Sequence, residues 1–220
     1  MKSTFPVALR RPLTVLLLGA ALSAGLQGCL PLMVGATAVT TLAATDRRTV
    51  GAQTDDKSIE LKGEGRAKRI TGDNGRVSVT SYNRMVLLTG EVKDEAMKAD
   101  VQRQVASIDN IRTIENDLVV APVSSVGARS NDLLITSKVK AAFIDTKDLY
   151  VNAFLVHTDR SVVYLMGRVT QREAKLAAEV ARNAGGVRKV VTLFEFISED
   201  ELSELQAKPA PDAPKASPAK

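Results

Sequence analysis

The 220-residue sequence has no tryptophan, one cysteine and one histidine, and only 4% of its residues are aromatic. A single thiol excludes an internal disulfide and any metal site built from several thiolates. His157, the only histidine, cannot by itself form a multi-histidine metal centre. It lies in a predicted strand, where we expect a structural role and no Ser–His–Asp catalysis. Since aromatics are scarce, each core must be built from Val, Leu, Ile and Ala.

Other chemical signatures are also missing. Asp145, Asp148 and Asp159 lack the glycine-centred spacing of a calcium loop. Gly90 and Gly167 follow strands but belong to no glycine-rich phosphate loop. The sequence therefore predicts a non-enzymatic protein without a cofactor or a metal site, and a hydrolase is only a distant alternative.

Positive charge is modest and unevenly placed. Residues 46–122 hold 13 basic and 13 acidic side chains, a net charge of 0. Residues 130–198 hold 10 basic and 7 acidic side chains, a net charge of +3. This surplus is far below that of a dedicated nucleic-acid-binding domain, so we expect no nucleic-acid partner.

The N-terminus combines a basic segment, Met1–Arg11, with a short apolar run, Leu13–Ala24. The run is too short for a comfortable transmembrane helix and is typical of a secretory signal peptide. It leads into Leu26-Gln27-Gly28-Cys29, which resembles a bacterial lipobox. We therefore predict a signal peptide over residues 1–28 and lipidation of Cys29. The alternatives are an ordinary signal peptide with an incidental cysteine, and an uncleaved anchor.

Residues 29–45 are predicted to form an acylated tether. The residue after Cys29 is Leu30 and not Asp, which, by resemblance to bacterial lipoprotein sorting, favours the outer membrane over retention at the inner membrane. The predicted location is the periplasmic face of the outer membrane. Since each buried methylene contributes about 0.8 kcal/mol, several acyl chains would anchor the protein firmly.

The folded part contains an internal repeat. Val86–Val92 reads VLLTGEV and returns, altered, as Val163–Val169, VYLMGRV. The two copies are 77 residues apart, from 86 to 163, which is the size of a small domain and too long for a solenoid repeat. We therefore predict a tandem duplication, with a first domain at 46–122 and a second at 130–198.

Both copies predict the order helix, strand, strand, helix, strand (αββαβ). In the first copy we expect a short or frayed helix before residue 70, a hairpin around Asn83-Arg84, a helix capped by Asp94 and one strand over 111–120. The amphipathic stripe of that second helix is Met97, Val101, Val105 and Ile108.

In the second copy, residues 123–129 are predicted to be a linker. A helix capped within Ser130–Asp132 should run to about Ile144, followed by a hairpin around Asp159-Arg160 and a helix with a capping box at Thr170 and Glu173. A strand over 187–197 completes the domain. Residues 199–220 are rich in proline and alanine near their end, which predicts a disordered tail.

The predicted helix that begins near Ser130 carries apolar residues on two faces. At about 100° per residue, Ile135, Val139 and Phe143 fall on one face, the expected core face. Other apolar residues lie off that face beside two lysines, a pattern typical of a membrane contact. The candidate lipid-binding residues are Leu133, Leu134, Lys138, Lys140, Ala141 and Ile144. Alternatively, Leu133 or Leu134 packs against the other domain.

The repeated hairpin strand, Val86-x-Leu88-x-Gly90-x-Val92 and its second copy, resembles the BON domain family. Two such units behind a lipobox resemble the dual-BON outer-membrane lipoproteins, over about residues 26–198. The resemblance implies an α+β fold of two αββαβ domains, each a small three-stranded mixed sheet with two helices packed on it.

The same resemblance implies a function. It implies binding of anionic phospholipid, notably phosphatidylglycerol, through the first helix of the second BON unit. It also implies a role in envelope integrity and division-site cell-wall remodelling. The alternative is a protein–protein adaptor for the outer-membrane barrel assembly machinery or for a peptidoglycan amidase regulator.

Overall fold

The computed structural model describes residues 46–207. The predicted signal peptide, the Cys29 lipidation site and the tether lie outside the described residues, as do residues 208–220 of the predicted tail.

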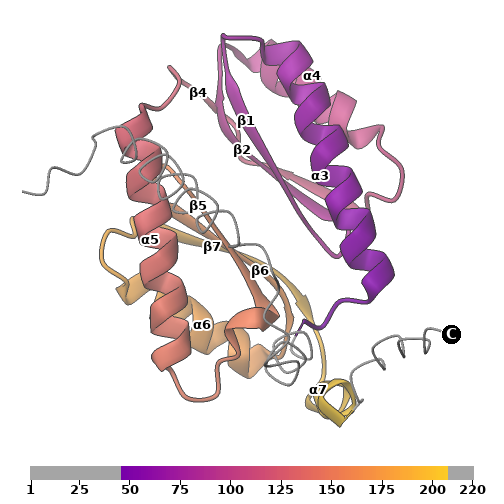
Figure 1. Cartoon of the computed structure of the whole chain (residues 1–220), viewed down its shortest axis with the longest axis vertical. Coiled ribbons are helices and arrows are strands. Elements are labelled where there is room, and N and C mark those ends of the chain that lie inside the picture. Colours follow the sequence, from indigo (N-terminus) through magenta and orange to yellow (C-terminus); the bar gives the residue numbers. More distant parts are fainter. Residues whose placement is uncertain (1–45, 208–220) are drawn as a thin grey trace, which may run out of the picture. The chain divides into compact units, whose positions relative to one another are not determined.

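The first domain consists of two helices on one face of a mixed sheet (Figure 1). A two-residue turn at Asn83-Arg84 joins β1 to the antiparallel β2, and β3 and β4 run parallel to β2. The elements are α3 (Val50–Thr71), β1 (Arg76–Tyr82), β2 (Met85–Val92), α4 (Glu95–Ala106), β3 (Thr113–Asn116) and β4 (Val119–Val120).

The second domain repeats this order. In its three-stranded sheet, β6 lies between the antiparallel β5 and the parallel β7. The predicted α+β class and the mixed sheets are therefore confirmed. The elements are α5 (Val126–Asp145), the 3₁₀ turn η3 (Val151–Ala153), β5 (Phe154–Asp159), β6 (Val162–Val169), α6 (Gln171–Asn183), β7 (Lys189–Phe196) and a further helix, α7 (Glu199–Ala207).

The cores are aliphatic, as the composition predicted. In the first domain, buried residues of α3 and α4 pack on Val79, Val86 and Leu88 of the hairpin. In the second, Ile135, Val139 and other buried residues of both helices pack on the sheet in the same way. Two phenylalanines, Phe143 and Phe154, add an edge-to-face contact there, with ring centroids 5.2 Å apart.

The prediction of a short or frayed first helix was wrong, because α3 is a regular helix of 22 residues. It buries one residue per turn against the sheet, at Ala52, Asp56, Ile59, Gly63 and Ala67. Tertiary packing thus outweighs the low helix propensity of its glycines.

The predicted strand over 111–120 is two shorter strands in one register along β2. Met85 pairs with Thr113 and Glu91 with Val119, a constant offset of 28 residues. The ladder is interrupted opposite Gly90, whose φ is +120°, and Leu118 turns into the core with 1% exposure. A Cβ on Gly90 would lie 2.0 Å from the Arg76 carbonyl oxygen, so only glycine fits there.

Helix α5 begins at Val126 and its N-cap is Ser125, so the predicted cap within Ser130–Asp132 was wrong and part of the predicted linker is helical. Asp132 is buried and accepts hydrogen bonds of 2.9 Å from the backbone amides of Arg160 and Ser161. These two residues form the hairpin turn, one position later than predicted. The capping box of Thr170 and Glu173 is confirmed.

Residues 199–207 form α7 rather than a disordered tail. Leu202 is 5% exposed, and Glu201 accepts a 2.6 Å hydrogen bond from Arg168 at the end of β6. Apolar contact and a charge pair therefore hold this helix on the second domain.

The chain before α3 also contacts the second domain. Arg47 donates two hydrogen bonds, of 2.8 and 2.7 Å, to the buried carboxylate of Glu173 and a third to the Arg168 carbonyl. The segment that leads back to the predicted tether is thus bound at the N-terminus of α6.

The sheets of the two domains share a further core. Tyr82 and Leu87 of the first domain form one buried cluster with Val162, Tyr164 and Met166 of the second. Polar contacts surround it: Thr89 hydrogen-bonds His157 at 2.9 Å, and Tyr164 donates to Asp117 at 2.5 Å.

Candidate functional site

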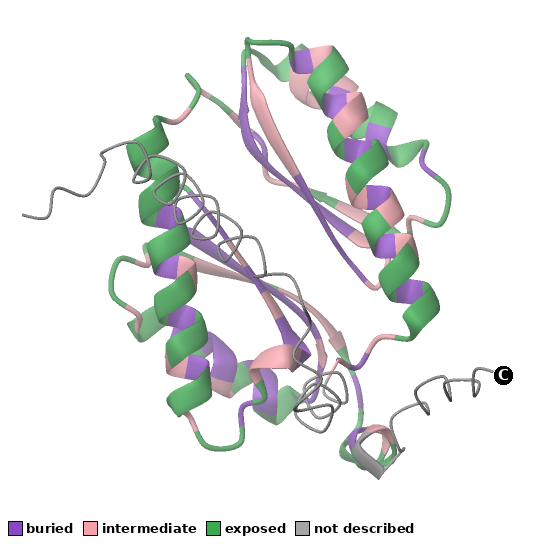
Figure 2. Ribbon diagram, in the orientation of Figure 1, coloured by how far each residue is buried: buried purple, intermediate pink, exposed green. Residues whose placement is uncertain are grey.

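The outer side of α5 is a continuous exposed surface. Figure 2 shows exposed residues along its whole outer side and buried residues only on the side toward the sheet. Leu133 is 70% exposed, Leu134 60% and Ile144 67%. Neither leucine packs against the other domain, so that alternative reading of the sequence was wrong.

Helical geometry gathers the exposed apolar residues into one strip. At about 100° per residue, Leu133 and Ile144 lie within about 20° of each other, and Leu134 and Ala141 follow on one flank. The core residues Ile135, Val139 and Phe143 are centred on the opposite side and are at most 1% exposed. We call the exposed group the α5 strip; it consists of Val126, Leu133, Leu134, Ala141 and Ile144.

Cations border the α5 strip. Lys140 lies beside Leu133 and Ile144, and Lys138 lies beyond Leu134, where its Nζ is 3.5 Å from the Gly185 carbonyl oxygen. Asp132 is buried, so Asp145, the last residue of α5, is the one exposed carboxylate of this helix. The exposed surface of α5 therefore carries apolar side chains together with the exposed Ser130 and Ser137, has lysines on its flanks and is nearly free of negative charge.

The equivalent helix of the first domain lacks this arrangement. The caps Thr49 and Ser125 align α3 with α5 at an offset of 76 residues. At that offset Leu133, Leu134 and Ile144 correspond to Lys57, Ser58 and Lys68. The core positions stay apolar: Ile59 and its counterpart Ile135 are both 1% exposed. Only the outer face differs between the two helices. The α5 strip is therefore not a requirement of the fold.

The sequence pattern identified the correct exposed face of α5 but missed the part of it near the start of the helix. Val126 is 69% exposed and Tyr150, just beyond α5, is 49% exposed. Val126 was outside the helix as predicted, because Ser130–Asp132 was taken as its cap, whereas Tyr150 lies beyond the C-terminus of α5. Ser125, a good N-cap residue directly before Val126, was the signal that could have extended the helix.

Among residues 46–207, none of the helices has the length and apolar character needed to cross a membrane.

Comparison with known proteins agrees with this architecture. The family model of the BON domain matches residues 65–122 and again 131–197, more than half of the chain. The chain is 33% identical over 184 residues to "Outer membrane lipoprotein DolP" of Haemophilus influenzae, an alignment that covers 83% of this chain and 94% of that protein.

Two further relatives are more distant. "21 kDa hemolysin" of Actinobacillus pleuropneumoniae is 29% identical over 157 residues, which cover 69% of this chain and 79% of that protein. "Osmotically-inducible protein Y" of Escherichia coli is 29% identical over 116 residues, 52% of this chain and 55% of that protein. From the repeated αββαβ fold and these matches together, the chain belongs to the BON domain family, as a DolP-like outer-membrane lipoprotein with two BON domains.

Proposed function

We propose that this protein is a non-enzymatic lipoprotein that binds anionic phospholipid through the α5 strip and its flanking lysines. The observation that carries the proposal is the exposure of Leu133, Leu134 and Ile144 on α5, at positions where α3 carries Lys57, Ser58 and Lys68. An exposed apolar strip between cations on a helix is typical of contact with a membrane interface.

The apolar part of the proposed contact supplies binding free energy. Burying a valine, leucine or isoleucine side chain contributes about 1.5–3 kcal/mol when burial is complete. Leu133, Leu134 and Ile144 are each at least 60% exposed, so most of this gain remains available. Their side chains would enter the boundary between headgroups and acyl chains.

The basic part selects the headgroup. A lysine near an anionic surface contributes about 1 kcal/mol, and the attraction decays within a Debye length of about 8 Å at physiological salt. Lys138 and Lys140 lie on either side of the α5 strip, where they would meet lipid phosphates. Phosphatidylglycerol, which has a net negative charge, is the expected ligand.

With the acyl anchor expected at Cys29, even a weak contact between the α5 strip and lipid would be enough to localise the protein. Linked binding converts the second contact into an intramolecular event at a high effective concentration. Two-point attachment of this kind would let the protein respond to the local lipid composition. Roles in envelope integrity and in division-site cell-wall remodelling are part of the proposal and rest on family resemblance.

The test is co-sedimentation, with vesicles, of the chain from Thr41 to Lys220, which lacks Cys29 and therefore the predicted anchor. We expect binding to vesicles that contain phosphatidylglycerol, little binding to neutral phosphatidylcholine vesicles, and weaker binding at higher salt. The double variant Leu134→Glu/Ile144→Glu should lose binding while keeping its fold, because both side chains are exposed.

A matched control is available on α3. Val50 and Leu61 are 70% and 68% exposed, so Val50→Glu/Leu61→Glu makes the same change of charge and polarity on the equivalent helix. The control should bind like the unaltered chain. Equal binding by both double variants would exclude the α5 strip as the lipid site. Absence of binding to any vesicle would favour a protein–protein adaptor, in which the same surface docks a barrel-assembly or peptidoglycan-remodelling factor.

A further inference from the structure

We propose that the first BON domain contains a separate site for a phosphate group, in the groove between α3 and α4. The groove encloses a hollow of about 220 Å³. This volume is below that of drug-sized ligand pockets, which is about 300–1,000 Å³, and suits a phosphate group with a small substituent. The hollow is lined by Arg66, Arg69 and Ile70 of α3 and by Asp100, Arg103 and Gln104 of α4.

Charge is concentrated in this groove. Three arginines and a single carboxylate, that of Asp100, line the hollow, although the first domain as a whole is neutral. Like charges gathered around one hollow repel each other, and an oxyanion in the hollow removes that repulsion. Guanidinium groups bind phosphate through paired N–H donors, so arginine is the cation suited to such a ligand.

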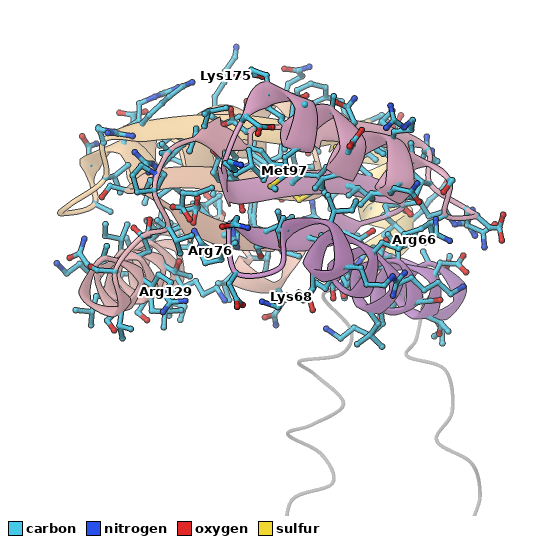
Figure 3. All side chains as sticks on the ribbon, turned by 90° about the horizontal axis from the view of Figure 1, so that it is seen from above. Arg66, Lys68, Arg76, Met97, Arg129 and Lys175 are labelled. Atoms are coloured by element: carbon cyan, nitrogen blue, oxygen red, sulfur yellow. The ribbon has the colours of Figure 1, made fainter. Side chains whose placement is uncertain are left out.

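The three arginines differ in how they are held. Arg66 reaches from α3 to α4, where its Nη1 donates to the Gln104 carbonyl at 2.8 Å and to the Ser107 hydroxyl at 2.5 Å (Figure 3). Arg103 pairs with Asp100 one turn earlier on α4. Two of the three side chains therefore already have partners on α4, although the Arg103–Asp100 pair is exposed to solvent.

Arg69 is the free cation of the groove. Its side chain has no hydrogen bond or ion pair with any residue in the range 46–207. Its Nη1 lies 3.8 Å from the position that a Cβ on Gly65 would occupy, so the guanidinium lies against the bare backbone one turn earlier. Capping of the α4 C-terminus explains Arg66, whereas Arg69 has no such contact and only its place in the last turn of α3, near the negative end of the helix dipole, favours a cation.

The second domain does not share this groove. The N-caps Asp94 and Thr170 align α4 with α6 at the same offset of 76 residues as α3 with α5. The counterparts of Arg66 and Arg69 are Ala142 and Asp145, and the counterpart of Arg103 is Glu179. The two repeats have therefore diverged in different places. The second has the apolar α5 strip, and the first has the groove lined by Arg66, Arg69 and Arg103, which we call the arginine groove.

The test is a titration of the chain from Thr41 to Lys220 with inorganic phosphate, followed by amide ¹H–¹⁵N NMR spectra, with sodium chloride at equal ionic strength as reference. We expect saturable shifts confined to Arg69, Ile70, Arg103 and their neighbours. Arg69→Gln should weaken binding about tenfold, the effect of losing one charge-assisted hydrogen bond. Asp100→Asn removes the competing carboxylate and should tighten binding several-fold.

Arg182→Gln is the matched control, since Arg182 is an exposed arginine of α6 far from the groove in sequence. It should leave phosphate binding unchanged, as should Leu134→Glu/Ile144→Glu, so the groove and the α5 strip are tested separately. Unsaturable shifts, or equal binding by Arg69→Gln and Arg182→Gln, would overturn the proposal. The dispersion of the spectra reports whether each variant is folded.

A second arm identifies the source of the phosphate. If Arg69→Gln also weakens co-sedimentation with phosphatidylglycerol vesicles, the groove binds a lipid headgroup. If it weakens binding of free phosphate alone, the groove takes a soluble phosphate compound. Both results support the site and differ only in what supplies its ligand.

Discussion

Asp56 and Asp132 hold the same position in the first helix of each domain, and each binds the turn of the hairpin that follows. Asp56 accepts hydrogen bonds from the amides of Asn83 and Arg84, at 2.8 and 2.7 Å. All four turn residues have positive φ, between 50° and 67°, although none is glycine: Asn83, Arg84, Arg160 and Ser161. Such a conformation is costly for ordinary residues, and the buried carboxylate compensates for it.

Replacing Asp132 with alanine should therefore destabilise the protein by about 2–3 kcal/mol, because two amides lose a charged acceptor and the strained turn loses its support. The measurement is the free energy of unfolding from urea titration. Asn131→Ala, an exposed neighbour on α5, should change it by less than about 0.5 kcal/mol. Similar losses for both variants would mean that Asp132 does not hold the turn.

At the scale of elements, helix α3 owes its length to its fit against the sheet. Gly63 faces Val79, and a Cβ at Gly63 would lie 2.8 Å from the Cγ1 of that valine. The helix can approach β1 closely only because this position has no side chain. Gly51, in the first turn of the same helix, is exposed, and its nearest neighbour to a Cβ would be 3.9 Å away.

Two glycine-to-alanine substitutions in α3 should therefore have opposite effects. Gly63→Ala should destabilise the protein by about 1–3 kcal/mol, since the added methyl group forces the helix away from β1. Gly51→Ala should stabilise it by up to about 1 kcal/mol, since alanine favours the helix and meets nothing. Thermal unfolding of both variants is the measurement, and stabilisation by Gly63→Ala would contradict the close packing.

At the scale of the whole molecule, ionisable groups are buried where the two domains meet. Burial alone would raise the pKa of Glu91, but hydrogen bonds from Ser124 and Arg76 and the charge of Arg76 lower it below its ordinary value. Burial also opposes ionisation of Glu173, whose pKa is lowered by Arg47 and by the Thr170 amide. Burial lowers the pKa of His157, which is neutral beside Thr89.

These shifts predict loss of stability in acid, in two steps. The His157 contribution is complete above pH 6.5, its ordinary pKa, and falls below it, because the unfolded chain takes up the proton more readily. The contributions of Glu91 and Glu173 are complete above pH 4.5, the ordinary pKa of a glutamate, and are lost as pH falls through their lower folded values.

The measurement is the urea midpoint as a function of pH. His157→Gln keeps a partner for Thr89 but does not titrate, so it should remove the decline that begins below pH 6.5 and leave the decline below pH 4.5. An unchanged upper step in this variant would assign it to another group.

Local patterns in the sequence determined much of this protein. Alternating apolar residues predicted the hairpins, the repeated VxLxGxV strand predicted two equivalent domains, and Asp94 and Thr170 predicted the starts of α4 and α6. The spacing of Ile135, Val139 and Phe143 separated the core face of α5 from the face that carries Leu134 and Ile144. All of these depend on residues close together in the chain.

Only the tertiary structure decided the features that depend on distant residues. The close packing of α3 on the sheet depends on Gly63 facing Val79. The division of the predicted strand into β3 and β4 shows only in its pairing with β2, and α7 is held by its contact with Arg168. The arginine groove likewise requires contact between two helices whose residues are far apart in the sequence, as Arg66 and Gln104 are, 38 positions apart. Propensity and periodicity report the preferences of a single segment, whereas the free energy of such contacts belongs to pairs of segments, and the sequence alone does not say which segments meet.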